Sequence, residues 1–78
     1  MKKIYIDPDN TSKLIKIEIA NLKLCVYDGF TEGKKTVWEN VESEMCNNEK
    51  DAENKFNEKC IEYSGYIEKP EELSEKIS

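Results

Sequence analysis

The sequence predicts an α+β domain in which a small antiparallel sheet of about four strands packs against one C-terminal helix. Two patterns support this prediction. Between residues 3 and 45, apolar and polar side chains alternate in short runs, which is the period of half-buried strands. Between residues 52 and 63, apolar side chains recur at helical spacing.

Three strands are expected in the first part of the chain. The first covers residues 3–7 and ends in a run of turn-forming residues. Residues 15–19 and 22–27 both alternate, and the tight reversal that residues 20–21 allow between them predicts a hairpin. We expect residues 28–33 to form a loop, because its two glycines can adopt positive φ.

The next segment, residues 36–45, fits two periods. Val37, Val41 and Met45 share one face of a strand, but their spacing of four residues also suits a helix. The β-branched residues Thr36 and Val37, with Trp38 beside them, favour a fourth strand.

A helix should follow, from a cap at Asn47 or Asn48 to about residue 64. Gly65 is positioned to end this helix in the left-handed conformation, and residues 66–68 then predict a short last strand. The predicted apolar stripe of the helix consists of Ala52, Phe56, Cys60 and Tyr63.

The composition excludes several classes of function. The chain has no histidine and no arginine, and its twelve lysines are outnumbered by seventeen carboxylates. Histidine is the commonest general base and metal ligand, and arginine is the side chain best suited to bind phosphate. We therefore expect a protein that is not an enzyme, that uses no cofactor and no metal, and that does not bind nucleic acid strongly.

At 78 residues the chain is expected to form one domain over residues 1–69, followed by an acidic tail at residues 70–78. No apolar run approaches the roughly 18 residues of a membrane span, so we expect a cytoplasmic protein with no membrane partner. The cysteines are too widely spaced for a metal motif and are expected to be buried or half-buried thiols; they are Cys25, Cys46 and Cys60.

Charge divides unevenly along the chain. Residues 1–35 hold seven lysines and five acids, whereas residues 36–78 hold five lysines and twelve acids, a net charge of −7. Such a surface repels a phosphate backbone and attracts a basic protein groove. A solvated acidic face without a specific partner would show the same run of charge.

Trp38 is the only tryptophan, and two roles are open to it. The more frequent role is a core position, where it would cover a large share of a small hydrophobic centre. Alternation places it outward instead if Val37 and Val41 face the helix, and Tyr5 and Tyr27 are then expected outward as well. An exposed tryptophan among carboxylates is a common anchor of protein interfaces.

Several segments, in this order and spacing, resemble parts of one known family. They are Lys2-Lys3-Ile4-Tyr5-Ile6, Asn10-Thr11-Ser12-Lys13, Ile15-Lys16-Ile17-Glu18-Ile19, Asp51-Ala52 with Phe56 and Lys59, and Gly65-Tyr66-Ile67-Glu68. They are similar to the opening strand, the asparagine-lysine turn, the second strand, the helix and the glycine-aromatic exit of the WGR domain. That small module occurs in DNA-repair poly(ADP-ribose) polymerases and as free-standing bacterial proteins. The resemblance covers residues 1–69.

The chain departs from this family at the signature itself. Trp-Gly-Arg would fall at Tyr27-Asp28-Gly29, so the arginine is absent and an aspartate has entered. In the family this aromatic-arginine hairpin contacts DNA ends, and the resemblance implies that role here only for Tyr27, Lys34 and Lys35. Because lysine lacks the bidentate fork of arginine, we expect such DNA affinity to be weak and steeply dependent on salt.

We favour a small acidic, non-catalytic binding protein that occupies a basic surface of a partner, such as a nucleic-acid-binding protein. In character it is similar to phage-encoded inhibitors of bacterial defence, including anti-CRISPR proteins. The predicted protein-binding residues are Trp38, Glu39, Glu42, Glu44, Glu49, Asp51 and Glu53.

The alternative is a WGR-like module that binds DNA ends through Tyr27, Lys34 and Lys35. A homodimer is compatible with both hypotheses, because an exposed sheet edge can pair with a second copy.

Overall fold

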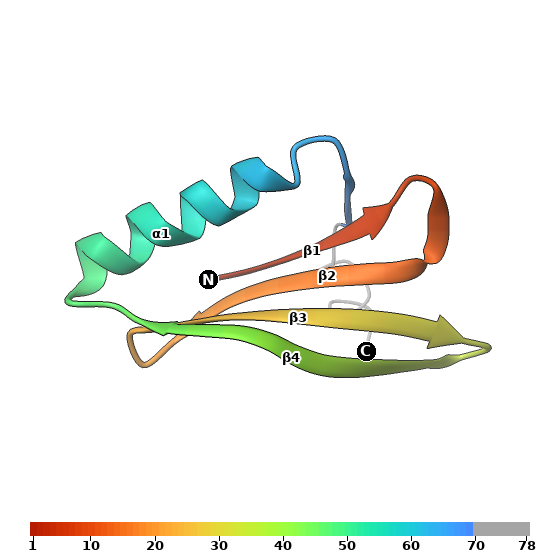
Figure 1. Cartoon of the computed structure of the whole chain (residues 1–78), viewed down its shortest axis with the longest axis horizontal. Helices are drawn as coiled ribbons and strands as arrows, with labels where there is room; N and C mark the ends of the chain where they lie inside the picture. Colours follow the sequence, from red (N-terminus) through yellow and green to blue (C-terminus); the bar gives the residue numbers. More distant parts are fainter. Residues whose placement is uncertain (70–78) are drawn as a thin grey trace, which may run out of the picture.

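The computed structural model describes residues 1–69, and the acidic tail expected at residues 70–78 lies outside the described residues. The described strands form one antiparallel sheet in the order β4-β3-β2-β1-β5, and the helix packs against one face of it (Figure 1). The predicted α+β fold is confirmed. The elements are β1 (Lys2–Asp7), β2 (Asn10–Ala20), β3 (Lys23–Glu32), β4 (Lys35–Met45), α1 (Glu49–Glu62) and β5 (Ile67–Lys69).

The core lies between α1 and the inner face of the sheet. Phe56, which is 4% exposed, meets Ile17 of β2 and Leu24 of β3 in one cluster of buried side chains. Ala52 belongs to the same cluster, and Cys60 and Tyr63 pack beside it, so the predicted stripe of the helix is confirmed.

Tyr5 also belongs to this core, and its predicted outward position is wrong. Its side chain is 5% exposed and its ring stacks on that of Tyr63, with the centroids 6.0 Å apart. Burial, followed by a hydrogen bond with the Cys60 side chain, raises the pKa of the Tyr5 phenol. The phenol therefore stays neutral inside the fold at physiological pH.

The hairpin of β3 and β4 is longer than predicted. Residues 28–32, which we expected in a loop, continue β3, and of the two glycines in that segment only Gly33 has positive φ. Gly29 is needed for a different reason, because the ring of Trp38 occupies the space that a Cβ would fill. The hairpin extends past the C-terminal end of α1 (Figure 1).

The turn between β2 and β3 consists of Asn21 and Leu22, one residue later than predicted. Both residues have positive φ (53° and 60°), as two-residue hairpin turns require. For leucine this conformation costs about 1–2 kcal/mol. The side chain of Leu22 packs against the core, and its carbonyl accepts a hydrogen bond from the Cys46 amide at 2.8 Å, which offsets that cost.

The helix begins and ends through specific polar contacts. The Asn48 side chain accepts a hydrogen bond from the Asp51 amide, which confirms an asparagine cap. At the other end Tyr63 is the capping residue, and the predicted left-handed Gly65 is wrong, because its φ is not positive. Instead, the Tyr66 amide donates to the Tyr63 carbonyl at 2.9 Å and the chain turns into β5.

In the described part of the chain, no helix has the length and apolar character needed to cross a membrane.

Candidate functional site: the open face of the sheet

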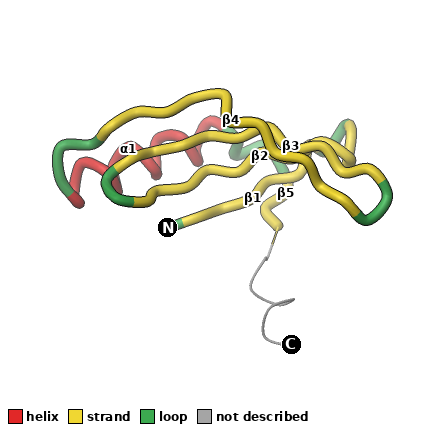
Figure 2. Tube along the Cα trace, turned by 90° about the horizontal axis from the view of Figure 1, so that it is seen from below, coloured by secondary structure: helices red, strands yellow, loops and turns green. Residues whose placement is uncertain are grey.

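The two faces of the sheet differ in what covers them. One face packs against α1, and no described element covers the other; in Figure 2 the helix lies behind the strands. We call this second surface the open face. From the strand register and the alternation of side chains, it carries Lys2, Ile4, Ile6, Leu14, Lys16, Glu18, Lys23, Cys25, Tyr27, Trp38, Ile67 and Lys69.

At the centre of the open face a lysine lies between two aromatic rings. The Nζ atom of Lys16 is 4.7 Å from the ring centroid of Tyr27 and 4.6 Å from that of Trp38. An ammonium group at this distance is attracted by the negative faces of the rings. We call these three side chains the aromatic-lysine cluster.

The strand register explains how the cluster assembles. Lys16 lies directly opposite Tyr27, and Trp38 lies directly opposite Gly29. Because Gly29 has no side chain, the indole ring lies across β3 and reaches toward Lys16 on β2. Together with Gly29, the cluster joins residues from three neighbouring strands.

A β-bulge in β4 lies between the part of the strand that carries Trp38 and its C-terminal part. The register of β4 shifts by one residue opposite Val26 and Tyr27, so Val41 has no partner on β3. The Asn40 side chain donates to the carbonyls of Val26 (3.2 Å) and Glu42 (3.1 Å) and holds this irregularity in place. As a result, the alternation of side chains between the two faces shifts by one residue at the bulge.

Tyr27 remains uncharged at physiological pH. A hydrogen bond with the Cys25 side chain is the first cause that raises its pKa, and the nearby carboxylate of Glu18 acts in the same direction. Its neutral ring therefore remains available for stacking.

Cys25 and Cys60 are half-buried free thiols and Cys46 is a buried one, so the prediction for the three cysteines is confirmed.

The structure separates charge by face, which the sequence did not reveal. On the open face Lys2 lies opposite Glu18, whereas within residues 1–69 no acidic residue lies opposite Lys16, Lys23 or Lys69. The side that carries α1 holds most of the carboxylates. On the strands these are Asp7, Asp28, Glu32, Glu39, Glu42, Glu44 and Glu68.

Glu42 and Glu44, two of the predicted protein-binding residues, are each paired with a lysine of α1. The Lys59 ammonium lies 3.1 Å from Glu42, and the Lys55 ammonium lies 2.8 Å from Glu44. Hydrogen bonds to these carboxylates raise the pKa of both lysines. Asp51 lies 3.5 Å from Lys55 and accepts a hydrogen bond from a backbone amide. Glu42 and Glu44 therefore join β4 to α1, whereas the contacts of Asp51 stay within the helix and the segment before it.

Neither predicted set of site residues forms one surface. In the protein-binding set, Trp38 lies on the open face, Glu39 is exposed on the α1 side, and Glu49 and Glu53 border a groove beside the helix.

The DNA-binding set is also divided. Lys34 and Lys35 lie at the tip of the hairpin, whereas Tyr27 pairs with Asn40. Five residues of β4 separate Lys35 from Asn40, about 16 Å at roughly 3.3 Å per residue. The structure instead brings together Tyr27 and Trp38, one residue from each set.

Lys16 and Gly29 are the members of this site that sequence reasoning missed. A signal for Lys16 was present, because counting outward from a turn at Asn21 and Leu22 places Lys16 opposite Tyr27. A comparable signal was present for Gly29, because counting outward from a turn at residues 33–34 places Gly29 opposite Trp38.

No family model, no curated protein and no solved structure matches this chain. The resemblance to the WGR domain therefore stays a prediction, and function must be argued from the residues themselves. Within residues 1–69, no group of three or more Cys, Asp or Glu side chains is arranged to hold a metal ion.

Proposed function

We propose that this protein is a non-catalytic nucleic-acid-binding module that holds a single strand across its open face. The observation that carries this proposal is the aromatic-lysine cluster, on a surface where no acid of the described strands lies opposite Lys16, Lys23 or Lys69. Proteins that bind single strands combine a basic surface, which follows the phosphates, with aromatic rings on which bases stack.

Each part of the cluster has a role in this proposal. Tyr27 and Trp38 offer rings for stacking, and such contacts are worth about 1–3 kcal/mol per base. The Lys16 ammonium, which lies over both rings, moves to a phosphate when a base takes its place. Lys23 and Lys69 extend the positive charge along β3 and to the far edge of the sheet.

A single strand fits this surface better than a duplex does. Duplex readout generally places a helix or a two-stranded ribbon in the major groove. The helix α1 carries five acids and three lysines, and it packs on the other face of the sheet. The hairpin tip with Lys34 and Lys35 is the remaining route to a duplex, and it is the basis of the DNA-end alternative.

Trp38 provides a direct assay, because it is the only tryptophan in the chain. A titration with an oligothymidylate of about 20 nucleotides, at about 50 mM salt, should quench its emission and reach saturation. With a labelled oligonucleotide, Lys16→Glu and Trp38→Ala should each weaken binding about tenfold or more. The matched control is Lys50→Glu, the same charge change on the exposed surface of α1, which should weaken binding less than about threefold.

Three outcomes would contradict the proposal. They are the absence of saturable binding, an equal loss for Lys16→Glu and Lys50→Glu, and a preference for a blunt duplex that Lys34→Glu with Lys35→Glu abolishes. The last result would favour DNA-end binding instead.

The hypothesis of a basic protein partner is still supported by the α1 side of the molecule, where Glu49 and Glu53 border a groove.

A further inference from the structure

A groove of about 570 Å³ lies on the α1 side, far from the aromatic-lysine cluster. It runs between the N-terminal half of α1, the start of β1 and the turn between β2 and β3. Apolar side chains form its floor, and two carboxylates of α1 stand at its rim. The floor consists of Met1, Ile19, Leu22 and Ala52, and the rim of Glu49 and Glu53.

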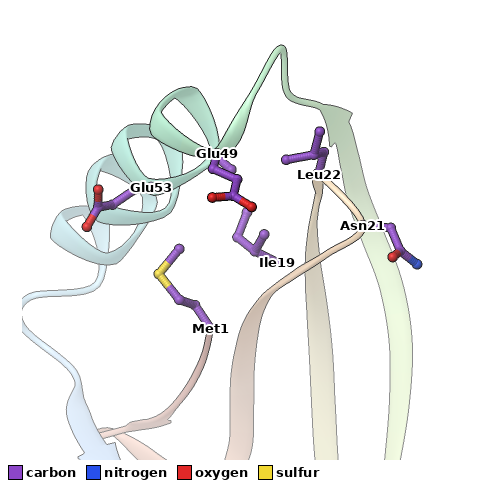
Figure 3. A pocket seen from close by; sticks show the side chains of 7 residues that line it. Met1, Ile19, Asn21, Leu22, Glu49 and Glu53 are labelled. Atoms are coloured by element: carbon purple, nitrogen blue, oxygen red, sulfur yellow. The ribbon is translucent and has the colours of Figure 1, made fainter.

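The side chains that line the groove converge from different elements. In Figure 3 the side chains of Met1 and Leu22 extend toward the space between helix and strands, and the Glu49 carboxylate lies above Ile19. Asn21 points away from this space, so the apolar residues and the carboxylates define its chemistry.

Both carboxylates border the groove, and within residues 1–69 no cation is paired with either of them. Glu49 and Glu53 lie four residues apart on one flank of α1, a spacing at which like charges repel. The helix lysines Lys55 and Lys59 lie toward β4 and pair with acids on that side. Within residues 1–69, neither Glu49 nor Glu53 takes part in an ion pair.

We propose that this groove binds a lysine or arginine side chain presented by a basic peptide segment of a partner protein. Such a side chain has an apolar stem and a charged head. The stem matches the apolar floor, and the head reaches the two carboxylates and relieves their repulsion. An apolar side chain would leave both carboxylates without a partner, and an anionic group would be repelled by them. The groove therefore gives the molecule a second binding site, independent of nucleic-acid binding on the open face.

The test is a titration of the full chain with a fluorescein-labelled octapeptide of alternating arginine and glycine. Glu49→Gln combined with Glu53→Gln should weaken binding about tenfold or more, because two charge-assisted contacts are lost. The matched control changes the same charge at two exposed acids outside the groove, Glu39→Gln with Glu58→Gln, and should weaken binding less than about threefold. The groove variant should melt within a few degrees of the native protein, since it removes a repulsion but also the favourable contact of the Glu49 charge with the N-terminus of α1.

A second measurement tests the apolar floor. In methyl spectra of the full chain, N-acetyl-arginine amide should shift the signals of Ile19 and Leu22, and methylguanidinium at the same concentration should shift them much less. Equal peptide affinity in the two double variants would overturn the proposal, as would equal shifts from the two small molecules. Trp38→Ala should leave peptide binding unchanged, so a failure of the nucleic-acid proposal would not affect this result.

Discussion

Replacement of Gly29 by alanine tests the packing of the open face directly. An added Cβ would lie 2.5 Å and 2.6 Å from two ring carbons of Trp38 and 3.0 Å from a third. Carbon atoms pack at about 3.5–4.0 Å, so the ring would have to move by about 1 Å or rotate away. The ring would then leave its position beneath the Lys16 ammonium.

The expected loss of stability follows from three opposing terms. Overpacking costs about 1–3 kcal/mol, and the loss of an exposed cation–π contact costs about 0.5–1 kcal/mol. Alanine also restricts the unfolded chain, which favours folding by about 0.4–1 kcal/mol because Gly29 does not need positive φ. The net destabilisation should be about 1–3 kcal/mol, which lowers the melting temperature by about 5–20 °C for a domain of this size.

Thermal and urea denaturation measure this loss, and the emission of Trp38 reports the displaced ring. Gly65→Ala is the matched control, because within residues 1–69 no atom beyond the two neighbours in the chain lies within 4 Å of its added Cβ, and its φ is not positive. We expect this variant to be as stable as the native protein or slightly more stable. Equal stability of the two variants, with unchanged tryptophan emission in Gly29→Ala, would refute the close packing of Trp38 on Gly29.

Three further predictions concern the core, its titration and the edge of the sheet. Phe56→Ala should cost about 3–5 kcal/mol by urea denaturation, whereas Phe30→Ala, at a side chain that is 49% exposed, should change stability by less than about 1 kcal/mol. Because burial raises the pKa of Tyr5 in the folded state, stability should be complete below about pH 10 and fall as the pH rises further, and Tyr5→Phe should reduce that fall in melts between about pH 8 and 11. Lys59→Met should destabilise the protein by about 1 kcal/mol at neutral pH, since it leaves Glu42 without its ion pair, and a melting temperature equal to that of the native protein would contradict this.

The order of the elements could be predicted because it depends on neighbouring residues. The alternation in β2 and the helical stripe of α1 are both patterns within one segment, and both predictions are confirmed.

Which face of a strand packs against the helix could not be predicted in the same way. Each face of β1 carries at least one large apolar side chain, with Ile4 and Ile6 on one face and Tyr5 beside Lys3 on the other. Alternation alone therefore did not show which face packs against the helix. The helix decided, because Tyr63 stacks on Tyr5.

The candidate site could not be predicted because it depends on contacts between segments. Alternation could place Trp38 and Tyr27 outward together, but a count along one strand does not show that Lys16 of β2 lies over both rings or that the indole covers Gly29 of β3. Likewise, Glu42 and Glu44 lie 17 and 11 residues before the lysines that neutralise them. A sequence shows such acids as a run of charge, and only the packing of α1 on β4 shows that they are paired.

The separation of charge between the two faces determines how a nucleic acid would sense this molecule. The acids of the α1 side lie about one layer, roughly 10 Å, from the open face. At physiological salt the screening length is about 8 Å, so a bound strand senses mainly Lys16, Lys23 and Lys69. At about 10 mM salt the screening length is about 30 Å, and the net charge of −5 acts as a whole.

Three phosphate contacts predict a slope of about −2 in a plot of log affinity against log salt near physiological salt. That slope should flatten at low salt, where repulsion by the far side opposes the gain. A slope that stays constant down to about 10 mM would contradict this long-range repulsion by the acids of the α1 side.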